Sequence, residues 1–303
     1  MKALVVGYGS IGKRHAAILI GMGLKVAVVS RRNQVDIKQY SKLADALKSW
    51  QPDYVVLASR TSEHAADLET LSASGFNGRL LIEKPLLNDT SQPPDGLPQN
   101  SYIAYNLRFH PAVVALRSAL ASSTVHTVHA YVGQYLPDWR PGTDYRESYS
   151  AQKSLGGGVL RDLSHEIDLI NWLFGPWRHL TAAGGKFSDL EIDTDDTFTL
   201  ILNMESRPHA SISMNYLDAR ATRYTVLQTD KGTLRLDLIA GALETDGEQE
   251  IFSVARDDTY HAEHKAILEG RTDALCDLNQ GIEVMNIILS AEKASRDQIW
   301  VAN

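Results

Sequence analysis

Short apolar runs alternate with longer amphipathic segments through the first hundred residues. Apolar runs bounded by glycine, proline or polar residues predict buried strands, and they cover residues 3–6, 25–29, 53–58, 79–82 and 101–105. Apolar side chains that recur every three or four positions predict helices over residues 11–22, 41–50 and 62–73. Strands that alternate with helices of about ten residues are typical of βαβ units and a parallel, doubly wound sheet.

The pattern changes after about residue 120, where strand-like segments follow one another with few helices between them. Partial period-two alternation predicts strands over residues 125–131, 198–202, 209–216, 224–229 and 233–238. Helices are predicted after Gly158 and near residues 260–269 and 272–296. Successive strands indicate an antiparallel sheet in an α+β domain. We therefore predict two domains, residues 1–115 and 116–303.

Composition narrows the possible partners. The 303 residues carry 30 basic and 37 acidic side chains, a net charge of −7, which argues against a nucleic-acid backbone as the partner. Cys276 is the single cysteine, so internal disulfides and cysteine-rich metal sites are excluded. No apolar run approaches the ~18–20 residues that span a bilayer, and the first apolar stretch is too short for a signal peptide. We expect a cytoplasmic protein with no membrane partner.

A glycine motif follows the first predicted strand and opens the first helix. In Gly7-Tyr-Gly9-Ser10-Ile11-Gly12, the first glycine makes a tight turn, the second admits a pyrophosphate, and the third lets helix and strand pack closely. Phosphates then bind the free N–H groups of the helix N-terminus. The motif predicts a dinucleotide site; the alternative is a glycine-rich turn that binds nothing.

The end of the second strand bears on the choice of cofactor. An acidic residue there would bind the ribose 2′-OH of NAD, but the chain has Ser30, Arg31 and Arg32, with no carboxylate before Asp36. Arginine pairs well with phosphate oxygens. The pattern favours NADP over NAD, unless both arginines belong to a solvated loop.

Three further motifs occur in a fixed order. They are Glu83-Lys84-Pro85, the segment Asn106-Leu-Arg108-Phe-His110-Pro111, and Gly156-Gly-Gly158 followed by Asp162-Leu-Ser-His165. With the N-terminal glycines, they resemble the Gfo/Idh/MocA family of glucose–fructose oxidoreductases and inositol dehydrogenases over nearly the whole chain. The resemblance implies an N-terminal α/β Rossmann domain and an α+β C-terminal domain with a large open, mainly antiparallel sheet. It also implies NAD(P)-dependent hydride transfer on a sugar, cyclitol or related carbon, and homodimers or homotetramers formed through that sheet.

The resemblance assigns roles by position. Lys84 is placed near the nicotinamide and the reacting hydroxyl, His165 is the catalytic acid–base, and Asp162 binds or orients substrate. Cofactor contacts fall to the loop after the third strand and to the strand end before Lys84, namely Ser59, Thr61, His64 and Glu83, although Glu83 is expected mainly to support local structure. The chain departs from the family where Arg60 replaces a frequent proline and where two residues, not three, separate Asp162 from His165.

The same residues suit the chemistry on general grounds. Alcohol oxidation needs a base, for which histidine is the natural choice, and a lysine can stabilise charge on the substrate oxygen. On one continuous helix Asp162 and His165 would lie about 60° apart. Their face would be opposite the apolar stripe of Leu160, Leu163, Ile167 and Ile170. Gly156 to Gly158 would let the backbone approach a ligand.

Substrate contacts are less constrained by the sequence. Asn106 and Arg108 are either ligand contacts or part of a polar hinge. The aromatic and basic segment 135–149 contains Trp139, which can stack on a sugar or base, Tyr145, and the anion-binding candidates Arg140 and Arg146. The alternative is an ordered surface loop; if the segment binds substrate, that substrate is anionic, such as an acidic or nucleotide-activated sugar. His261 and His264 lack a third ligand nearby, so no metal is expected.

Two other functions compete with the dehydrogenase. One is a glycosidase that retains its NAD and acts by transient oxidation and elimination. The other is a cofactor-sensing regulator without catalysis, against which the presence of both Lys84 and His165 argues.

Overall fold

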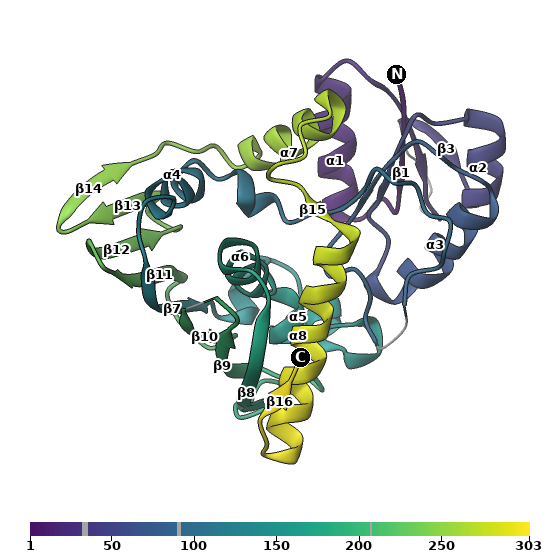
Figure 1. Cartoon of the computed structure of the whole chain (residues 1–303). Helices are drawn as coiled ribbons and strands as arrows, with labels where there is room; N and C mark the ends of the chain where they lie inside the picture. Colours follow the sequence, from purple (N-terminus) through teal and green to yellow (C-terminus); the bar gives the residue numbers. More distant parts are fainter. Residues whose placement is uncertain (32–35, 90–91, 207) are drawn as a thin grey trace. The chain divides into compact units, whose positions relative to one another are not determined.

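The chain forms two compact units, each built on its own sheet (Figure 1). The computed structural model describes residues 1–31, 36–89, 92–206 and 208–303. Unit 1 contains residues 1–106 and 257–282, and unit 2 contains residues 107–256 and 283–303. This division differs from the predicted 1–115 and 116–303, because a segment near the C-terminus returns to unit 1.

Unit 1 has a seven-stranded sheet of order β15-β6-β5-β4-β1-β2-β3. Its strands are β1 (Lys2–Val6), β2 (Lys25–Val29), β3 (Lys38–Tyr40), β4 (Tyr54–Leu57), β5 (Arg79–Ile82), β6 (Ser101–Ile103) and β15 (Cys276–Asp277). All neighbours pair in parallel except β15, which is antiparallel to β6. The order reverses at β1, so the predicted Rossmann fold is confirmed, with its switch point between β1 and β4.

Helices and buried strand residues form the core of unit 1. Its helices are α1 (Ser10–Gly21), α2 (Leu43–Trp50), α3 (His64–Ala73), α7 (Asp258–Glu269) and the short η1 (Thr61–Glu63). Strand residues such as Leu4, Val55 and Leu81 are fully buried, as expected for strands covered on both faces. Cys276 and Asp277 join β6 as an edge strand, which explains why residues 257–282 belong to this unit.

Unit 2 is organised on a nine-stranded sheet of order β14-β13-β12-β11-β7-β10-β9-β8-β16. Its strands are β7 (Val125–Gly133), β8 (Trp177–Gly185), β9 (Thr197–Met204), β10 (His209–Asn215), β11 (Thr222–Thr229), β12 (Gly232–Asp237), β13 (Ala242–Thr245), β14 (Glu248–Ile251) and β16 (Val301–Ala302). Only the β7–β10 pair is parallel among these strands. The predicted mainly antiparallel sheet is thus confirmed.

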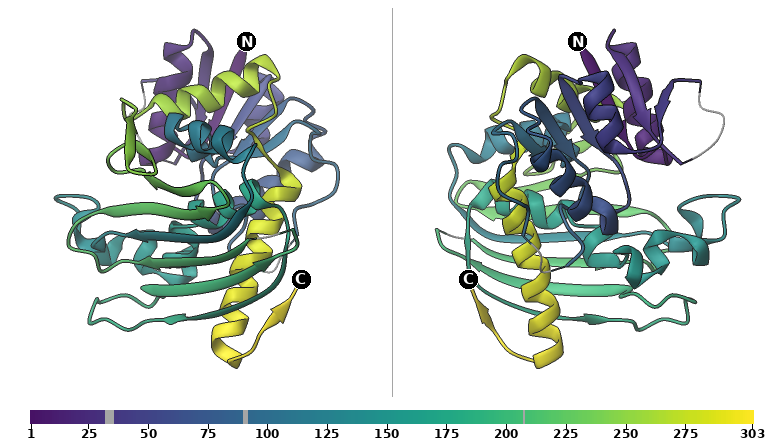
Figure 2. Two further views of the ribbon diagram at one scale, coloured as in Figure 1. Left: turned by 60° about the vertical axis from the view of Figure 1, so that its left-hand side comes forward. Right: turned by 90° about the vertical axis from the view of Figure 1, so that its right-hand side faces the viewer.

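Helices of unit 2 pack on one face of this sheet (Figure 2). They are α4 (Pro111–Leu120), α5 (Val159–Asp162), α6 (His165–Phe174) and α8 (Leu278–Asp297), which begins in unit 1. Along β10, Ala210, Ile212 and Met214 are buried while the alternate Ser211 and Ser213 are half-buried. This alternation indicates one face that packs against helices and another that is open.

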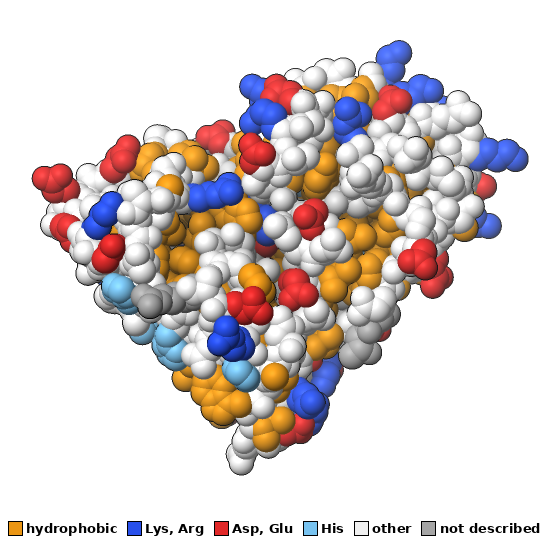
Figure 3. Space-filling model, in the orientation of Figure 1, with side chains coloured by type: hydrophobic (Ala, Val, Ile, Leu, Met, Phe, Trp, Pro, Cys, Tyr) orange, Lys and Arg blue, Asp and Glu red, His pale blue; other side chains and the backbone are white. Residues whose placement is uncertain are grey.

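The surface carries charges of both signs. On the face drawn in Figure 3, acidic and basic side chains are interspersed, without a continuous basic area. Over the described residues, no helix is both long enough and apolar enough to cross a membrane.

Candidate active site

The glycine motif has three different environments that match its three predicted roles. Gly7 follows β1 with φ +89°, and a Cβ there would lie 2.4 Å from the Ala58 carbonyl oxygen. A Cβ on Gly12 would lie 2.1 Å from the Gly7 carbonyl oxygen, whereas one on Gly9 would meet no atom within 4 Å. Gly7 and Gly12 are therefore required by packing, and Gly9 borders open space.

That open space adjoins the first turn of α1. Gly9 is the N-cap residue, and Ser10 and Ile11 begin the helix. Backbone N–H groups in a first turn lack intrahelical acceptors, which suits a phosphate group. The residues present therefore fit the pyrophosphate of a dinucleotide.

The end of β2 is only partly described. Ser30 is buried and its N–H donates to the Tyr40 carbonyl at 3.0 Å. The Arg31 side chain is 88% exposed and its Nη1 lies 3.7 Å from Glu63 Oε1, a distance at which an exposed pair contributes little. Arg32 lies outside the described residues.

The loop after β4 is tied to α3 and to the segment after β5. Ser59 Oγ donates to Asp67 Oδ2 at 2.6 Å, and Thr61 is buried at the start of η1. His64 is also buried, and its Nδ1 lies 3.0 Å from the Leu86 carbonyl oxygen. Burial lowers the pKa of His64, so a neutral ring donates to Leu86.

Lys84 lies where the sequence predicted, at the carboxyl end of β5. The preceding Glu83 N–H donates to the Leu57 carbonyl at 2.8 Å, continuing the sheet by one residue. The Lys84 N–H donates to Glu83 Oε2 at 3.2 Å, and the Lys84–Pro85 peptide bond is cis. Lys84 thus shares the carboxyl edge of the sheet with the glycine motif, the edge at which open α/β sheets bind ligands.

The predicted single helix after Gly158 is wrong, because two helices are present. Helix α5 ends at Asp162, and α6 begins at His165 after a turn at Leu163 and Ser164. Leu163 has φ −100° and ψ 23°, away from helical values, and the Asp168 N–H then donates to the Ser164 carbonyl at 2.9 Å. His165 is therefore the first residue of α6, and a helical angle between Asp162 and His165 has no meaning.

Acidic residues of α5 and α6 each have a partner in unit 2. Tyr216 OH donates to Asp162 Oδ2 at 2.7 Å, and Asp162 is 5% exposed. Arg223 binds Glu166 through Nε at 2.5 Å and Nη2 at 2.8 Å. The sequence did not single out Tyr216 or Arg223, which come from a later part of the chain.

The side chains of Arg108 and Asn106 form hydrogen bonds within the protein. Arg108 is fully buried and binds Asp168 through Nε at 3.0 Å and Nη2 at 2.6 Å. Asn106 Nδ2 donates to Thr259 Oγ1 at 2.7 Å within unit 1. A buried guanidinium in a bidentate pair already has a strong partner, so the structure gives Arg108 a structural contact. Substrate binding by Asn106 and Arg108 stays a prediction.

The glycines before α5 also serve packing rather than ligand approach. A Cβ on Gly157 would lie 2.1 Å from the Tyr149 carbonyl oxygen, and one on Gly158 would lie 2.3 Å from Asp195 Oδ1. Asp195 Oδ2 accepts the Leu160 N–H at 3.1 Å. These glycines allow the chain to approach itself at the start of α5.

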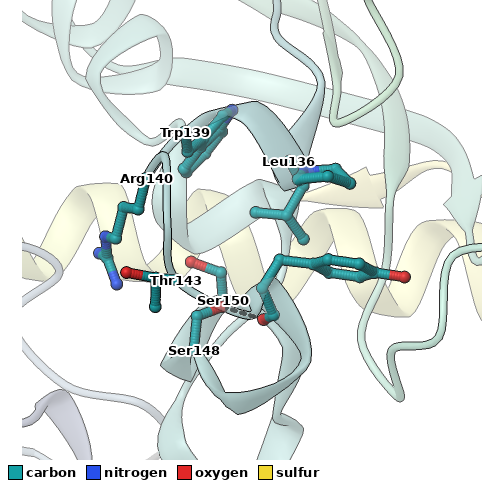
Figure 4. Close-up of a pocket in the computed structure, with 8 residues that line it drawn as sticks. Leu136, Trp139, Arg140, Thr143, Ser148 and Ser150 are labelled. Atoms are coloured by element: carbon teal, nitrogen blue, oxygen red, sulfur yellow. Dashed lines mark hydrogen bonds between the residues drawn. The ribbon is translucent and has the colours of Figure 1, made fainter.

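Segment 135–149 forms a pocket within unit 2 (Figure 4). Its lining comprises Leu136, Pro137, Trp139, Arg140, Thr143, Tyr145, Ser148 and Ser150. Trp139 Nε1 donates to the Gln134 carbonyl at 3.1 Å, and its ring meets Tyr216 edge-on with centroids 5.2 Å apart. Since Tyr216 also donates to Asp162, one residue links the pocket wall to Asp162.

Arg140 and Arg146 differ in whether their guanidinium groups form ion pairs with carboxylates of the chain. Arg146 binds Asp144 at 2.6 Å and Glu191 at 3.0 Å. The Arg140 guanidinium lies over the Tyr149 ring, 5.4 Å from its centroid, and it takes part in none of the ion pairs among the described residues. Tyr145 OH accepts the Glu191 N–H at 3.2 Å. Arg140 is thus the better anion-binding candidate of the two.

Metal chemistry has no visible site in the described parts of the chain. There, no group of three or more His, Cys, Asp or Glu side chains is arranged to hold a metal ion. His264, one of the two histidines considered from the sequence, is buried between His15 and Tyr54.

Comparison with known proteins gives consistent matches over both units. The profile of an oxidoreductase family with an NAD-binding Rossmann fold, GFO_IDH_MocA, matches residues 1–93. The GFO/IDH/MocA C-terminal domain profile matches residues 113–235. A search of curated proteins finds no significant match.

Solved structures share the fold over the whole chain. GenD2 from gentamicin A biosynthesis, in complex with NAD, has 21% identity and a TM-score of 0.82, covering 100% of this chain and 96% of that one. The WlbA dehydrogenase from Bordetella pertussis, in complex with NADH and UDP-GlcNAcA, has 17% identity and a TM-score of 0.82, covering 100% and 97%. The myo-inositol 2-dehydrogenase from Lactobacillus plantarum has 15% identity and a TM-score of 0.78, covering 100% and 99%.

Proposed function

Because this chain belongs to the Gfo/Idh/MocA family of NAD-binding oxidoreductases, we propose that it transfers a hydride between NADP(H) and a sugar-like substrate. The observation that carries the proposal is the edge of the sheet in unit 1. There, Gly9 borders open space at the start of α1, and Lys84 follows β5 at the same edge. When bound, the cofactor supplies the hydride acceptor or donor.

We assign the proton chemistry to two side chains. His165 accepts the hydroxyl proton during oxidation and returns it during reduction, as a general acid–base does. The Lys84 ammonium donates a hydrogen bond to the reacting oxygen and stabilises its developing negative charge. Asp162, fixed by Tyr216 at 2.7 Å, orients the substrate.

Preference for NADP over NAD is the part of this proposal that concerns Arg31. Its exposed guanidinium has only the 3.7 Å contact with Glu63 among the ion pairs of the described residues. The side chain can therefore turn to a 2′-phosphate, and a charge-assisted hydrogen bond of about 1.5–3 kcal/mol corresponds to roughly 10- to 100-fold in affinity.

We expect Arg31→Ala to weaken NADPH binding by roughly 10- to 100-fold and NADH binding by less than about twofold. Calorimetric titration of both cofactors measures this, and Lys25→Ala, an exposed lysine at the start of β2, is the matched control. Tighter binding of NADH than NADPH by the wild-type protein would overturn the preference. An equal loss for both cofactors would remove Arg31 from the phosphate site.

The substrate we propose is an anionic sugar, such as an acidic or nucleotide-activated one. Arg140 supports this class because its charge has no acidic partner among the described residues and borders a pocket with Trp139. Aromatic rings such as Trp139 can stack on a sugar or a base. The complex of WlbA with UDP-GlcNAcA provides a precedent within the same fold.

A substrate screen followed by nicotinamide absorbance tests this function, with neutral, acidic and nucleotide-activated sugars compared. For an anionic substrate, Arg140→Ala should raise KM by roughly tenfold, the value of one lost charge-assisted hydrogen bond, with kcat largely kept. Arg146→Ala is the matched control, because Asp144 and Glu191 already bind its guanidinium. Equal effects of both variants would exclude an anion site at Arg140. Cleavage of aryl glycosides without net change in absorbance would instead support the NAD-retaining glycosidase.

A second copy of the chain is our proposed partner for the open sheet face of unit 2. This face carries Tyr131 and Tyr224, whose rings stack with centroids 5.5 Å apart, and the half-buried Ser211 and Ser213. Aromatic residues are enriched where proteins pack against one another, so the paired tyrosines support an interface on this face. A monomeric mass in sedimentation at micromolar concentration would contradict a homodimer or homotetramer.

A further inference from the structure

A buried chain of hydrogen bonds crosses unit 1 and ends beside Lys84. Tyr54 OH lies 2.8 Å from His264 Nδ1, and His264 Nε2 lies 2.8 Å from His15 Nδ1. His15 Nε2 then lies 2.7 Å from Glu83 Oε1. We call these four residues, Tyr54, His264, His15 and Glu83, the histidine relay. They come from β4, α7, α1 and the end of β5.

When His15 is neutral, the acceptor at one end sets the direction of every hydrogen bond in the relay. A carboxylate only accepts, so His15 Nε2–H donates to Glu83, and a neutral ring then has Nδ1 as an acceptor. His264 must then donate from Nε2–H, and its Nδ1 accepts the Tyr54 hydroxyl proton. Burial lowers the pKa of His264 and raises that of Tyr54, which keeps both side chains neutral, as this arrangement requires.

Glu83 links the histidine relay to the backbone of Lys84 through its two carboxylate oxygens. One carboxylate oxygen, Oε1, is bound by His15, and the other, Oε2, accepts the Lys84 N–H at 3.2 Å. Tyr54, His264 and His15 are all fully buried, so water does not compete for these hydrogen bonds. The carboxylate plane is therefore held from the protein interior, and the peptide that carries the Lys84 side chain is held by the carboxylate.

Helix α7 is fixed in unit 1 by contacts on either side of His264. Thr259 Oγ1 accepts from Asn106 Nδ2 at 2.7 Å, and the Ile267 carbonyl accepts from Arg79 Nε at 3.2 Å. His264 is 249 residues from His15 along the chain. His264 thus reaches the relay because residues 257–282 belong to unit 1.

We propose that the histidine relay positions Lys84 for hydride transfer, with Tyr54, His264 and His15 acting through Glu83 as positioning residues. This inference rests on the proposed function, in which Lys84 binds the reacting oxygen. It assigns to the two histidines a role in orientation rather than proton exchange with substrate.

Two substitutions within the interior test the role in turnover. Tyr54→Phe removes only the terminal hydroxyl, and His264→Gln keeps one donor and one acceptor. Each should lower kcat about fivefold, the effect of one neutral hydrogen bond transferred to the barrier, with KM and cofactor affinity within about twofold. Tyr102→Phe, a buried tyrosine on β6 outside the relay, is the matched control and should leave kcat unchanged. If kcat falls and KM changes to the same extent in Tyr54→Phe, His264→Gln and Tyr102→Phe, the effect is a general structural one and the proposal is overturned.

Nuclear magnetic resonance of the protein without cofactor provides a readout that does not depend on activity. The relay requires His15 and His264 to carry a proton on Nε2 and none on Nδ1, and Tyr54→Phe should shift the Lys84 amide resonance while Tyr102→Phe does not. A proton on Nδ1 of either ring, or an unmoved Lys84 amide, would overturn the relay. If the relay passes this test but no sugar-like substrate is turned over, the proposed function fails by itself. A shifted amide with unchanged kcat in Tyr54→Phe would overturn the positioning role.

Discussion

His165→Ala should lower kcat by about 10²–10⁴-fold, the contribution of a positioned general acid–base, while KM and cofactor affinity change little. His165 begins α6, directly after the turn that separates it from α5. Removal of its ring leaves no other imidazole within the Asp162–Asp168 segment. His126→Ala, an exposed histidine on β7, is the matched control and should retain wild-type turnover.

Lys84→Met extends the same test to the second proposed catalytic group. This substitution keeps the length of the side chain and removes its charge, so kcat should fall by about 10²–10³-fold, as when a donor to a developing oxyanion is lost. Lys48→Met, an exposed lysine on α2, is the control. If both groups act on one transition state, as proposed, the double variant should lose less than the product of the two single effects. Unchanged turnover in both single variants would remove them from the mechanism.

The sequence was informative about elements whose local pattern matches their burial. Strands β1, β4 and β5 are short apolar runs with nearly every side chain buried, and they were predicted. Strand β14 was not, because three of the four residues of Glu248–Ile251 are polar and all four are exposed, without the alternation by which a half-buried strand is found. Strands β15 and β16 have two residues each, too few for any periodicity.

The roles of Arg108 and His264 could not be predicted because their partners lie far away in the sequence. The guanidinium of Arg108 suited a substrate anion, yet the fold supplies Asp168 as its buried partner. An arginine pairs in the same way with a substrate anion and with a buried carboxylate. The residue type alone therefore does not tell which of the two partners Arg108 has. Likewise His264 was considered only as a metal ligand, because its contact with His15, 249 residues away, has no local signal.

The turn between α5 and α6 could not be predicted from the spacing of apolar residues. Apolar positions Leu160, Leu163 and Ile167 keep helical spacing across it, and all three are buried. Burial of this stripe is therefore compatible with one helix or with two, and periodicity does not distinguish them. The interruption changes what is expected of His165, which stands at a helix start rather than in a helix interior.

The glycine motif should separate cofactor binding from folding when each glycine is replaced by alanine. Gly9 has φ −77° and open space where a Cβ would be, so Gly9→Ala should leave the thermal midpoint within about 2 °C, as for surface changes that disturb no contact. A bound pyrophosphate would need that space, so dinucleotide affinity should fall by roughly tenfold or more, the result of losing about 1.4 kcal/mol. Gly21→Ala, at the end of α1 and also without a neighbour within 4 Å, is the control and should lower neither quantity, since alanine is the better helix former.

Gly7→Ala and Gly12→Ala should instead destabilise the protein without any cofactor present. At Gly7, alanine meets the cost of positive φ, about 1–2 kcal/mol, and a Cβ contact of 2.4 Å with a carbonyl oxygen. At Gly12 the contact is 2.1 Å, again with backbone oxygen, and overpacking of this kind costs about 1–3 kcal/mol. Urea unfolding of the apo variants measures these losses, and calorimetric titration measures affinity in those that fold. Wild-type dinucleotide affinity in Gly9→Ala would show that the open space beside α1 is not the pyrophosphate site, whatever the stability of the other two variants.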